Sequence, residues 1–313
     1  MLPEISLPKF STTIKEIKTT FHFRPFMMKE ERAILMAKAI GTDIEVRQTI
    51  EQVVEACLIS NKKIIVEDLP AHIVDYLFMQ MYARSNTNVL SVNFHCHANY
   101  TKYDFVKKTD PDTGEEYEEE VKSEHLCGHE SLNPLDLTAI TLHYPHDFEK
   151  KKEIKVSDSI TLYFNAPKSK SIRNVYKMTE TDEVTGEFIH SDEERDDAYS
   201  DLIYESIDKV VEINKDGEEI IFTIDDFTKD SFADWIDNAP KNVTEQMTIL
   251  FSEMPTIYLK TTMRCLRPEC QNSTDISLTG ARSFLDLCWV DQRMYRWWKK
   301  LMTWLLITSS TWV

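Results

Sequence analysis

The sequence is poor in glycine and lacks a long apolar run. Only 6 of its 313 residues are glycine, and none stands in the GxGxxG or GxxxxGK spacing of phosphate-binding loops. The apolar stretch at residues 301–307 is much shorter than the roughly 20 residues that a bilayer-spanning helix needs. From these absences we expect neither kind of phosphate-binding loop, and we expect no helix that spans a membrane.

Basic residues are also in the minority. The chain has 53 acidic and 36 basic residues, a formal net charge of -17 and a pI near 5.0. Because affinity for nucleic acid comes largely from phosphate neutralisation, this composition argues against a nucleic-acid partner and favours protein surfaces. A chain of this length can bury a real core, more typically in two or three subdomains than in one.

Cysteines are few, but four of the six occur in two separated pairs. No charged-then-apolar signal segment begins the chain, so a reducing cytoplasm is the expected compartment and a disulfide scaffold is not. Cys265 and Cys270 form the neck of one zinc-knuckle-like turn. Cys96 and Cys127, the latter followed by Gly128, form a second neck if the roughly thirty residues between them are an insertion, which loop-closure entropy tolerates. Structural zinc takes four ligands, so we predict one zinc ion held by Cys96, Cys127, Cys265 and Cys270.

Two alternatives to this shared site stay open at the level of sequence. The four cysteines are also compatible with free thiols in a reducing compartment. Nearby histidines offer another possibility, because each can replace a sulfur and complete a local half-site: His95, His97, His125 and His129. Cys57 is different, since it lies on the apolar stripe of a predicted helix over residues 43–58 and is expected in the core.

Periodicity predicts an α+β fold. An N-terminal hairpin within residues 1–26 precedes three helices, of which the second has a capping box at Thr42 and Glu45. Alternating patterns predict strands at residues 89–94, 135–143 and 160–164 and a hairpin at 102–108 and 116–123. Seven carboxylates between Asp110 and Glu120 lack the spacing of a calcium loop and are expected to be solvated.

The second half is predicted to mix helices with a hairpin. A short helix is expected at 169–176, a mobile charged linker at 180–197 and a longer helix at 198–211. A strand at 220–224, helices at 229–238 and 243–254 and strands at 257–263 and 275–278 follow. The predicted fold thus comprises an N-terminal hairpin plus helices, a middle antiparallel β region with zinc-ribbon-like hairpins, and C-terminal helices with a hairpin.

We divide the chain into five segments on this basis. They are an N-terminal α+β region (1–87), a middle β region (88–167), an acidic linker and helix (168–212), a C-terminal α+β region with the cysteine knuckle (213–287) and a Trp-rich tail (288–313). The tail contains five of the six tryptophans and has one acid, Asp291, beside four basic residues. A basic amphipathic helix at a membrane surface and a lost reading frame near residue 287 are both compatible with it.

No catalytic constellation is recognisable. His143 and His146 lie near Glu149 in the sequence, but no serine or cysteine accompanies them at a recognisable turn. A zinc site made of four cysteines is coordinatively closed and leaves no position for water. We therefore predict that the protein is not an enzyme.

Several motifs resemble the baseplate hub protein family of T-even-type contractile-tailed phages. The resemblance covers most of residues 1–287 and is most specific in the first ninety. It rests on Phe23-Arg24-Pro25-Phe26, Lys29-Glu30-Glu31, Asp68-Leu69-Pro70, Asp75-Tyr76-Leu77-Phe78, Ala83-Arg84-Ser85, Phe251-x-x-Met254-Pro255, the Cys265–Cys270 pair, Leu278-Thr279-Gly280 and Ser283-Phe284. The sequence departs from the family in its Trp-rich tail and in the longer acidic insertion of its first knuckle.

The resemblance implies a structural or assembly component of a phage tail baseplate hub. Its partners are then other hub and tail proteins, and its location is the virion tail baseplate, with the host cytoplasm during assembly. The alternative is a zinc-ribbon adaptor that binds a protein partner transiently. Neighbouring genes for tail-tube, tape-measure or spike proteins would favour the hub.

Overall fold

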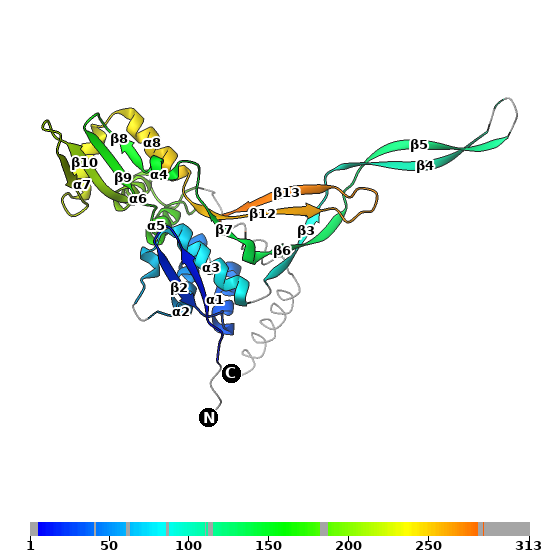
Figure 1. Ribbon diagram of the computed structural model, residues 1–313, viewed down its shortest axis with the longest axis horizontal. Coiled ribbons are helices and arrows are strands. Elements are labelled where there is room, and N and C mark those ends of the chain that lie inside the picture. The colour runs from blue at the N-terminus through cyan, green and yellow to red at the C-terminus, as the bar shows by residue number, and fades with distance from the viewer. Residues whose placement is uncertain are drawn as a thin grey trace. The chain divides into compact units, whose positions relative to one another are not determined.

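The computed structural model describes residues 6–40, 42–60, 63–85, 88–109, 111, 115–181, 187–280 and 284. The chain groups into two compact units, one made of Met1–Asn88 with Ile140–Tyr258 and the other of Val89–Ala139 with Leu259–Val313. Helices and antiparallel sheets both contribute (Figure 1), and the predicted α+β class is confirmed.

The first unit begins with the predicted hairpin and three helices. Strands β1 (Phe10–Ile14) and β2 (Thr19–Phe23) pair antiparallel and lead into helices α1 (Met28–Ile40), α2 (Asp43–Cys57) and α3 (Ala71–Ser85), with a short 3-10 turn η1 (Val66–Asp68) before α3. Phe23, Val54 and Leu77, from β2, α2 and α3, are fully buried. The apolar spacing of the helices thus corresponds to a real core.

The start of α2 has the capping box predicted from sequence. The Thr42 hydroxyl accepts a hydrogen bond from the Glu45 amide at 3.4 Å, and the Glu45 carboxylate accepts one from the Thr42 amide at 2.8 Å. Both amides lack an intrahelical acceptor, so these bonds replace contacts with water.

We expect Thr42→Ala to lower the free energy of unfolding by about 1 kcal/mol, since it removes the side-chain acceptor at this helix terminus. Urea unfolding followed by circular dichroism measures this loss. Thr42→Ser keeps the hydroxyl and should stay close to wild type. Equal stability of the alanine and serine variants would contradict a stabilising role for the cap.

A four-stranded antiparallel sheet forms the rest of the first unit. Its order is β11 (Glu219–Phe222), β10 (Ile207–Ile213), β9 (Ile160–Phe164) and β8 (Glu153–Lys155). Helices α7 (Lys229–Asp237) and α8 (Lys241–Ser252) pack on it through Phe232 and Leu250, which share a buried cluster with Leu162 and Val210. Helices α4 (Phe148–Lys151), α5 (Ser169–Met178) and α6 (Asp192–Glu205) complete the unit.

Two predictions in this region were wrong. The helix expected over 198–211 ends at Glu205, and Ile207–Ile213 is strand β10, because this segment pairs with β9 on one side and β11 on the other. Helix α6 also begins at Asp192, within the segment expected to be a mobile linker, and Ser191 with Glu194 forms its capping box. Both errors placed a boundary too late in the chain, where local patterns are weakest.

The second unit is built mainly from long antiparallel strands. β3 (Val89–His95) pairs with β6 (Glu130–Asp136), and β4 (Asn99–Thr109) pairs with β5 (Glu116–Leu126). The single strand expected over 135–143 is instead three elements: the end of β6, a short turn η2 (Leu137–Ala139) and β7 (Thr141–His143). β7 belongs to the first unit and pairs there with residues 256–258, the start of β12 (Thr256–Arg264). The other neighbour of β12 is β13 (Ser273–Thr279).

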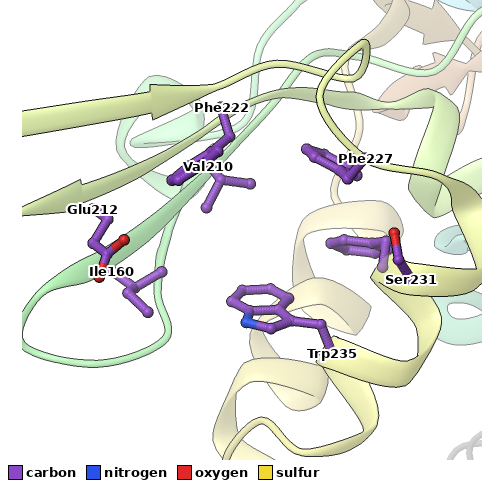
Figure 2. Close-up of a pocket in the computed structure, with 8 residues that line it drawn as sticks. Ile160, Val210, Glu212, Phe222, Phe227, Ser231 and Trp235 are labelled. Atoms are coloured by element: carbon purple, nitrogen blue, oxygen red, sulfur yellow. The ribbon is translucent and has the colours of Figure 1, made fainter.

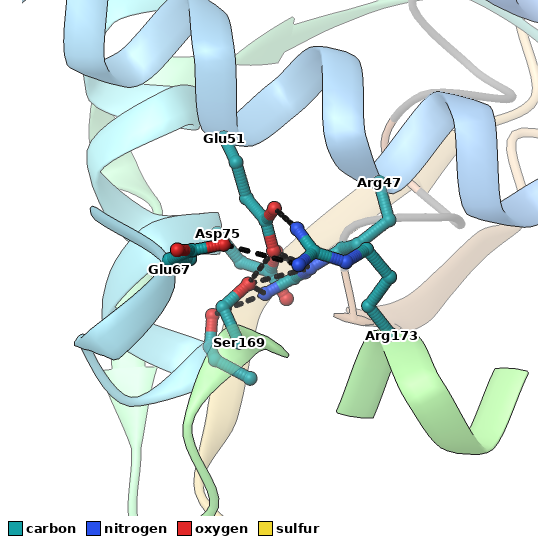
Figure 3. Close-up of polar contacts among 7 residues, drawn as sticks. Arg47, Glu51, Glu67, Asp75, Ser169 and Arg173 are labelled. Atoms are coloured by element: carbon teal, nitrogen blue, oxygen red, sulfur yellow. Dashed lines mark hydrogen bonds and ion pairs between the residues drawn. The ribbon is translucent and has the colours of Figure 1, made fainter. Parts of the chain in front are cut away.

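A buried ionic network joins α2, α3 and α5 in the first unit (Figure 3). The Arg47 guanidinium donates to Asp75, to the Ser169 hydroxyl through Nε at 3.0 Å and to the carbonyl oxygen of Ala71 at 3.2 Å. Ser169 in turn donates to Glu51, which also accepts from Arg173. Arg47, Glu51 and Ser169 are buried, and within the described ranges every buried side-chain nitrogen and oxygen has a partner.

Two sequence predictions fall outside the described residues. The Trp-rich tail at 288–313 is one of them, as are four of the five turn residues Asp110–Gly114. Among the helices that the structure does describe, none combines the length and apolar character needed to cross a bilayer.

Candidate metal centre

The first cysteine neck lies where the chain leaves β3 and returns to β6. The Cys96 amide donates to the His129 carbonyl oxygen at 3.0 Å, and the Gly128 amide donates back to the Cys96 carbonyl oxygen at 3.0 Å. Gly128 has a φ of 58°, a left-handed conformation that strains other residues. The predicted insertion between Cys96 and Cys127 is the β4–β5 hairpin, which we call the arm.

The second neck follows β12. The Cys265 amide donates to the Asn272 carbonyl oxygen at 2.8 Å, and the Cys270 amide donates to that of Arg267 at 3.1 Å. Asn133 on β6 ties this turn to the first neck, since its side chain accepts from the Arg264 amide at 2.8 Å and donates to the Arg264 carbonyl oxygen at 3.0 Å. The two necks therefore face each other within the second unit.

The four predicted cysteines lie together. The Sγ atoms of Cys96 and Cys270 are 3.8 Å apart, those of Cys127 and Cys265 are 3.6 Å apart, and all four lie within 4.8 Å of one another. Zinc–sulfur bonds of about 2.3 Å in a tetrahedron place the sulfurs about 3.8 Å apart. The cluster thus has the donor type, number and spacing to hold a metal ion.

The nearby histidines do not join this group. His95 is half exposed, with its Nδ1 3.8 Å from the Glu130 carboxylate, and the His125 ring is hydrogen-bonded to Ser123 at 2.9 Å. Among the described residues, the cluster that can hold a metal contains the four cysteines and no histidine. His129 contributes its backbone carbonyl oxygen to the first neck.

Electrostatics favour a cation between the sulfurs. Desolvation raises the pKa of the Cys265 thiol and raises that of Cys270 to about 12. Desolvation acts in the same direction at Cys127, but the His129 amide and neighbouring side chains lower its pKa to about 7. Four thiolates therefore do not form together near neutral pH without a compensating positive charge.

Three supporting residues were not predicted from sequence. Arg267 donates to the Cys127 carbonyl oxygen at 2.8 Å, and its guanidinium lies 4.9 Å from the centre of the Tyr100 ring. Ser131 and Asn133 occupy the inward-facing positions of β6 beside Leu135. The sequence did contain a signal for Ser131 and Asn133, because polar residues on the inward face of a strand need hydrogen-bond partners when they are buried.

The second residue group considered in the sequence does not form a site. His143 packs on the Tyr258 ring, with the ring centres 5.3 Å apart, whereas His146 pairs with Asp147 at 2.9 Å. Glu149 pairs with Lys152 at 3.0 Å. Each of the three has a different neighbour. Cys57 is buried in α2, where it was expected to belong to the core.

Comparison with known protein families gives a match over most of the chain. The family described as T4 bacteriophage base plate protein matches residues 7–286, which is most of the chain and includes all four clustered cysteines. Neither the curated proteins nor the solved structures contain a match. On the extent of the family match, the chain belongs to the T4 bacteriophage base plate protein family.

Proposed function

We propose that this protein is a structural or assembly component of the baseplate hub and acts through protein–protein contacts. Membership of the family places it in the baseplate of a phage tail. The observation that carries the proposed mode of action is the arm, which is exposed on both faces and begins and ends at clustered cysteines.

The arm exposes large apolar side chains, which an isolated hairpin cannot bury. Each strand has eleven residues, and β4 and β5 form a sheet of their own. Tyr103 and Phe105 lie on one face with 57% and 68% of their surface exposed. An isolated two-stranded hairpin is marginally stable in water, so contact with a neighbouring protein would supply the missing burial.

We further propose that Cys96, Cys127, Cys265 and Cys270 bind one structural zinc ion. The ion would supply a closed cross-link between the two necks, with no open coordination position for a reaction. Cys96 and Cys127 fix the two ends of the arm, and Cys265 and Cys270 fix the turn after β12. The cross-link would thus hold the root of the arm rigid and ready for contact.

Deletion of the gene tests the proposed function. We expect phage heads to form while tails do not assemble, because a missing hub component blocks baseplate formation. Electron microscopy of infected-cell lysates distinguishes these outcomes. Normal tails in the deletion strain would contradict the proposal.

Complementation tests the arm. Phe105→Ser should fail to restore tails, whereas Met28→Ser, which changes a large apolar side chain of similar exposure (70%) on α1, should restore them. Both variants should melt like wild type, since neither side chain is buried. Restoration by both would argue against contact through this face of the arm.

A further inference from the structure

A cavity of about 280 Å³ lies between the four-stranded sheet and α7 in the first unit (Figure 2). Apolar side chains line most of it, among them Ile160, Val210, Phe222 and Trp235, and Glu212 and Ser231 supply the polar groups. Its volume is near the lower end of the roughly 300–1,000 Å³ of ligand pockets. The cavity is therefore suited to one bulky apolar side chain.

The apolar surface of the cavity continues along β11. Strand register places Phe222 opposite Val210 and Ile220 opposite Glu212, so these residues share the face that looks toward α7. Ile220 and Phe222 are exposed despite this position, as is Ile221 on the other face. Three consecutive exposed apolar residues on one strand indicate a surface that a partner covers.

β11 is also an edge strand with free backbone groups. The Asn214 amide donates to the Glu218 carbonyl oxygen at 2.9 Å, which fixes the alternation of bonded pairs between β10 and β11. By this alternation, Ile220 and Phe222 bond to β10, whereas the amides and carbonyls of Glu219 and Ile221 point outward. An additional strand can pair with these groups.

The segment that contains β11 and α7 is acidic, which specifies the charge of the partner. Residues 212–237 contain nine carboxylates and two lysines, and one of these, Lys229, pairs with Asp201 at 2.7 Å. The carboxylates are Glu212, Asp216, Glu218, Glu219, Asp225, Asp226, Asp230, Asp234 and Asp237. A basic segment complements this surface and an acidic one is repelled by it.

We propose that this unit binds an extended, lysine- or arginine-rich segment of a partner protein, which adds to the free edge of β11 and places one bulky apolar side chain in the cavity. Backbone pairing supplies affinity, the cavity selects an aromatic or large aliphatic residue, and Glu212 pairs with a basic residue two positions away on the same face. This inference does not depend on the baseplate role.

The probe is a fluorescein-labelled heptapeptide with the sequence valine-lysine-threonine-tryptophan-threonine-lysine-valine. Its tryptophan and both lysines share one face when the peptide is extended. Fluorescence anisotropy with the full chain should detect binding. Peptides with alanine for tryptophan, or glutamate for both lysines, should bind at least about tenfold more weakly, a loss of about 1.4 kcal/mol.

Ile221→Pro is the decisive variant, because proline removes an outward amide and leaves the bonds between β10 and β11 in place. We expect it to weaken binding about tenfold, the effect of a lost backbone hydrogen bond at the upper end of the usual range. Ile221→Ala is the matched control and keeps the amide, so it should bind like wild type. Glu212→Lys should weaken binding of the basic peptide and strengthen that of the glutamate peptide. Circular dichroism establishes that each variant is folded.

Three results would overturn the proposal. The first is equal binding by Ile221→Pro and Ile221→Ala, which would exclude strand addition at this edge. The second is equal binding of the tryptophan and alanine peptides, which would exclude the cavity. The third is no binding to the full chain, as expected if its own Trp-rich, basic residues 288–313 already fill the site.

Discussion

Replacing Cys265 by serine is expected to abolish zinc binding and to expose the root of the arm to protease. The Cys265 thiol is buried, its Sγ lies 3.6 Å from that of Cys127, and the group of described residues that can hold a metal consists of the four cysteines. Serine supplies no thiolate, and three remaining sulfurs do not complete a structural zinc site. Elemental analysis should find about one zinc ion per wild-type chain and none in the variant.

Proteolysis reports the structural consequence of losing the ion. Lys102 and Lys122 lie in the part of the arm nearest the cysteines. Trypsin can cleave the peptide bonds that follow these lysines only when β4 and β5 separate there. We expect cleavage at these two sites to be about tenfold faster in Cys265→Ser. This factor corresponds to a decrease of about 1.4 kcal/mol in the free energy of separating the two strands there. Chelation of wild-type protein should give the same cleavage pattern.

Cys57→Ala is the matched control for this experiment. Cys57 is buried in α2 of the other unit, and burial raises its pKa to about 11, so its thiol stays neutral and is not a ligand. The variant should keep its zinc and its resistance to trypsin at Lys102. It should lose some stability, because the smaller alanine side chain leaves a small cavity in the core. Zinc retained by Cys265→Ser would contradict the shared site and favour a half-site completed by a histidine.

Local signals predicted α2 and the cysteine cluster for different reasons. Thr42 and Glu45 determine where α2 begins through bonds between residues three apart, which can be seen in the sequence. The cluster was predictable because zinc requires four ligands and two cysteine pairs were available. The arm also follows from the sequence as an insertion between Cys96 and Cys127, but its exposure on both faces does not, because an alternating pattern does not say what covers each face.

The error at the end of α6 has another cause. Ile203 and Ile207 fit a helical stripe, yet Ile207 belongs to β10 because its neighbours Val210 and Val211 pair with strands on both sides. The cavity beside Trp235 depends on the same pairing, since register alone places Val210 and Phe222 on one face. Long-range pairing of this kind overrides local propensity and cannot be obtained from one segment of sequence.

Arg47→Met is expected to lower the free energy of unfolding by about 3–5 kcal/mol, the usual cost of removing one member of a buried ionic network. Methionine fills the volume of the aliphatic stem but donates no hydrogen bond. Asp75 then loses its guanidinium, and the Ser169 hydroxyl and Ala71 carbonyl oxygen lose a donor. Glu51 keeps its hydrogen bonds from Ser169 and Arg173, so part of the network remains in the variant.

The sequence gives little sign of this network, which makes the experiment informative about how the unit is stabilised. Arg47 and Ser169 are 122 residues apart in the sequence, and nothing local in α2 indicates that Arg47 lies on the buried face of the helix beside Ile50 and Val54. Arg47→Lys should also be destabilising, because an ammonium group cannot reach Asp75, Ser169 and Ala71 in the fork geometry of a guanidinium. Lys241→Met is the matched control: its ion pair with Glu245 is largely exposed, and its loss should change stability by less than about 0.5 kcal/mol. Urea unfolding followed by far-ultraviolet circular dichroism compares the three variants, and a loss at Arg47 no larger than that at Lys241 would mean that the network does not stabilise the fold.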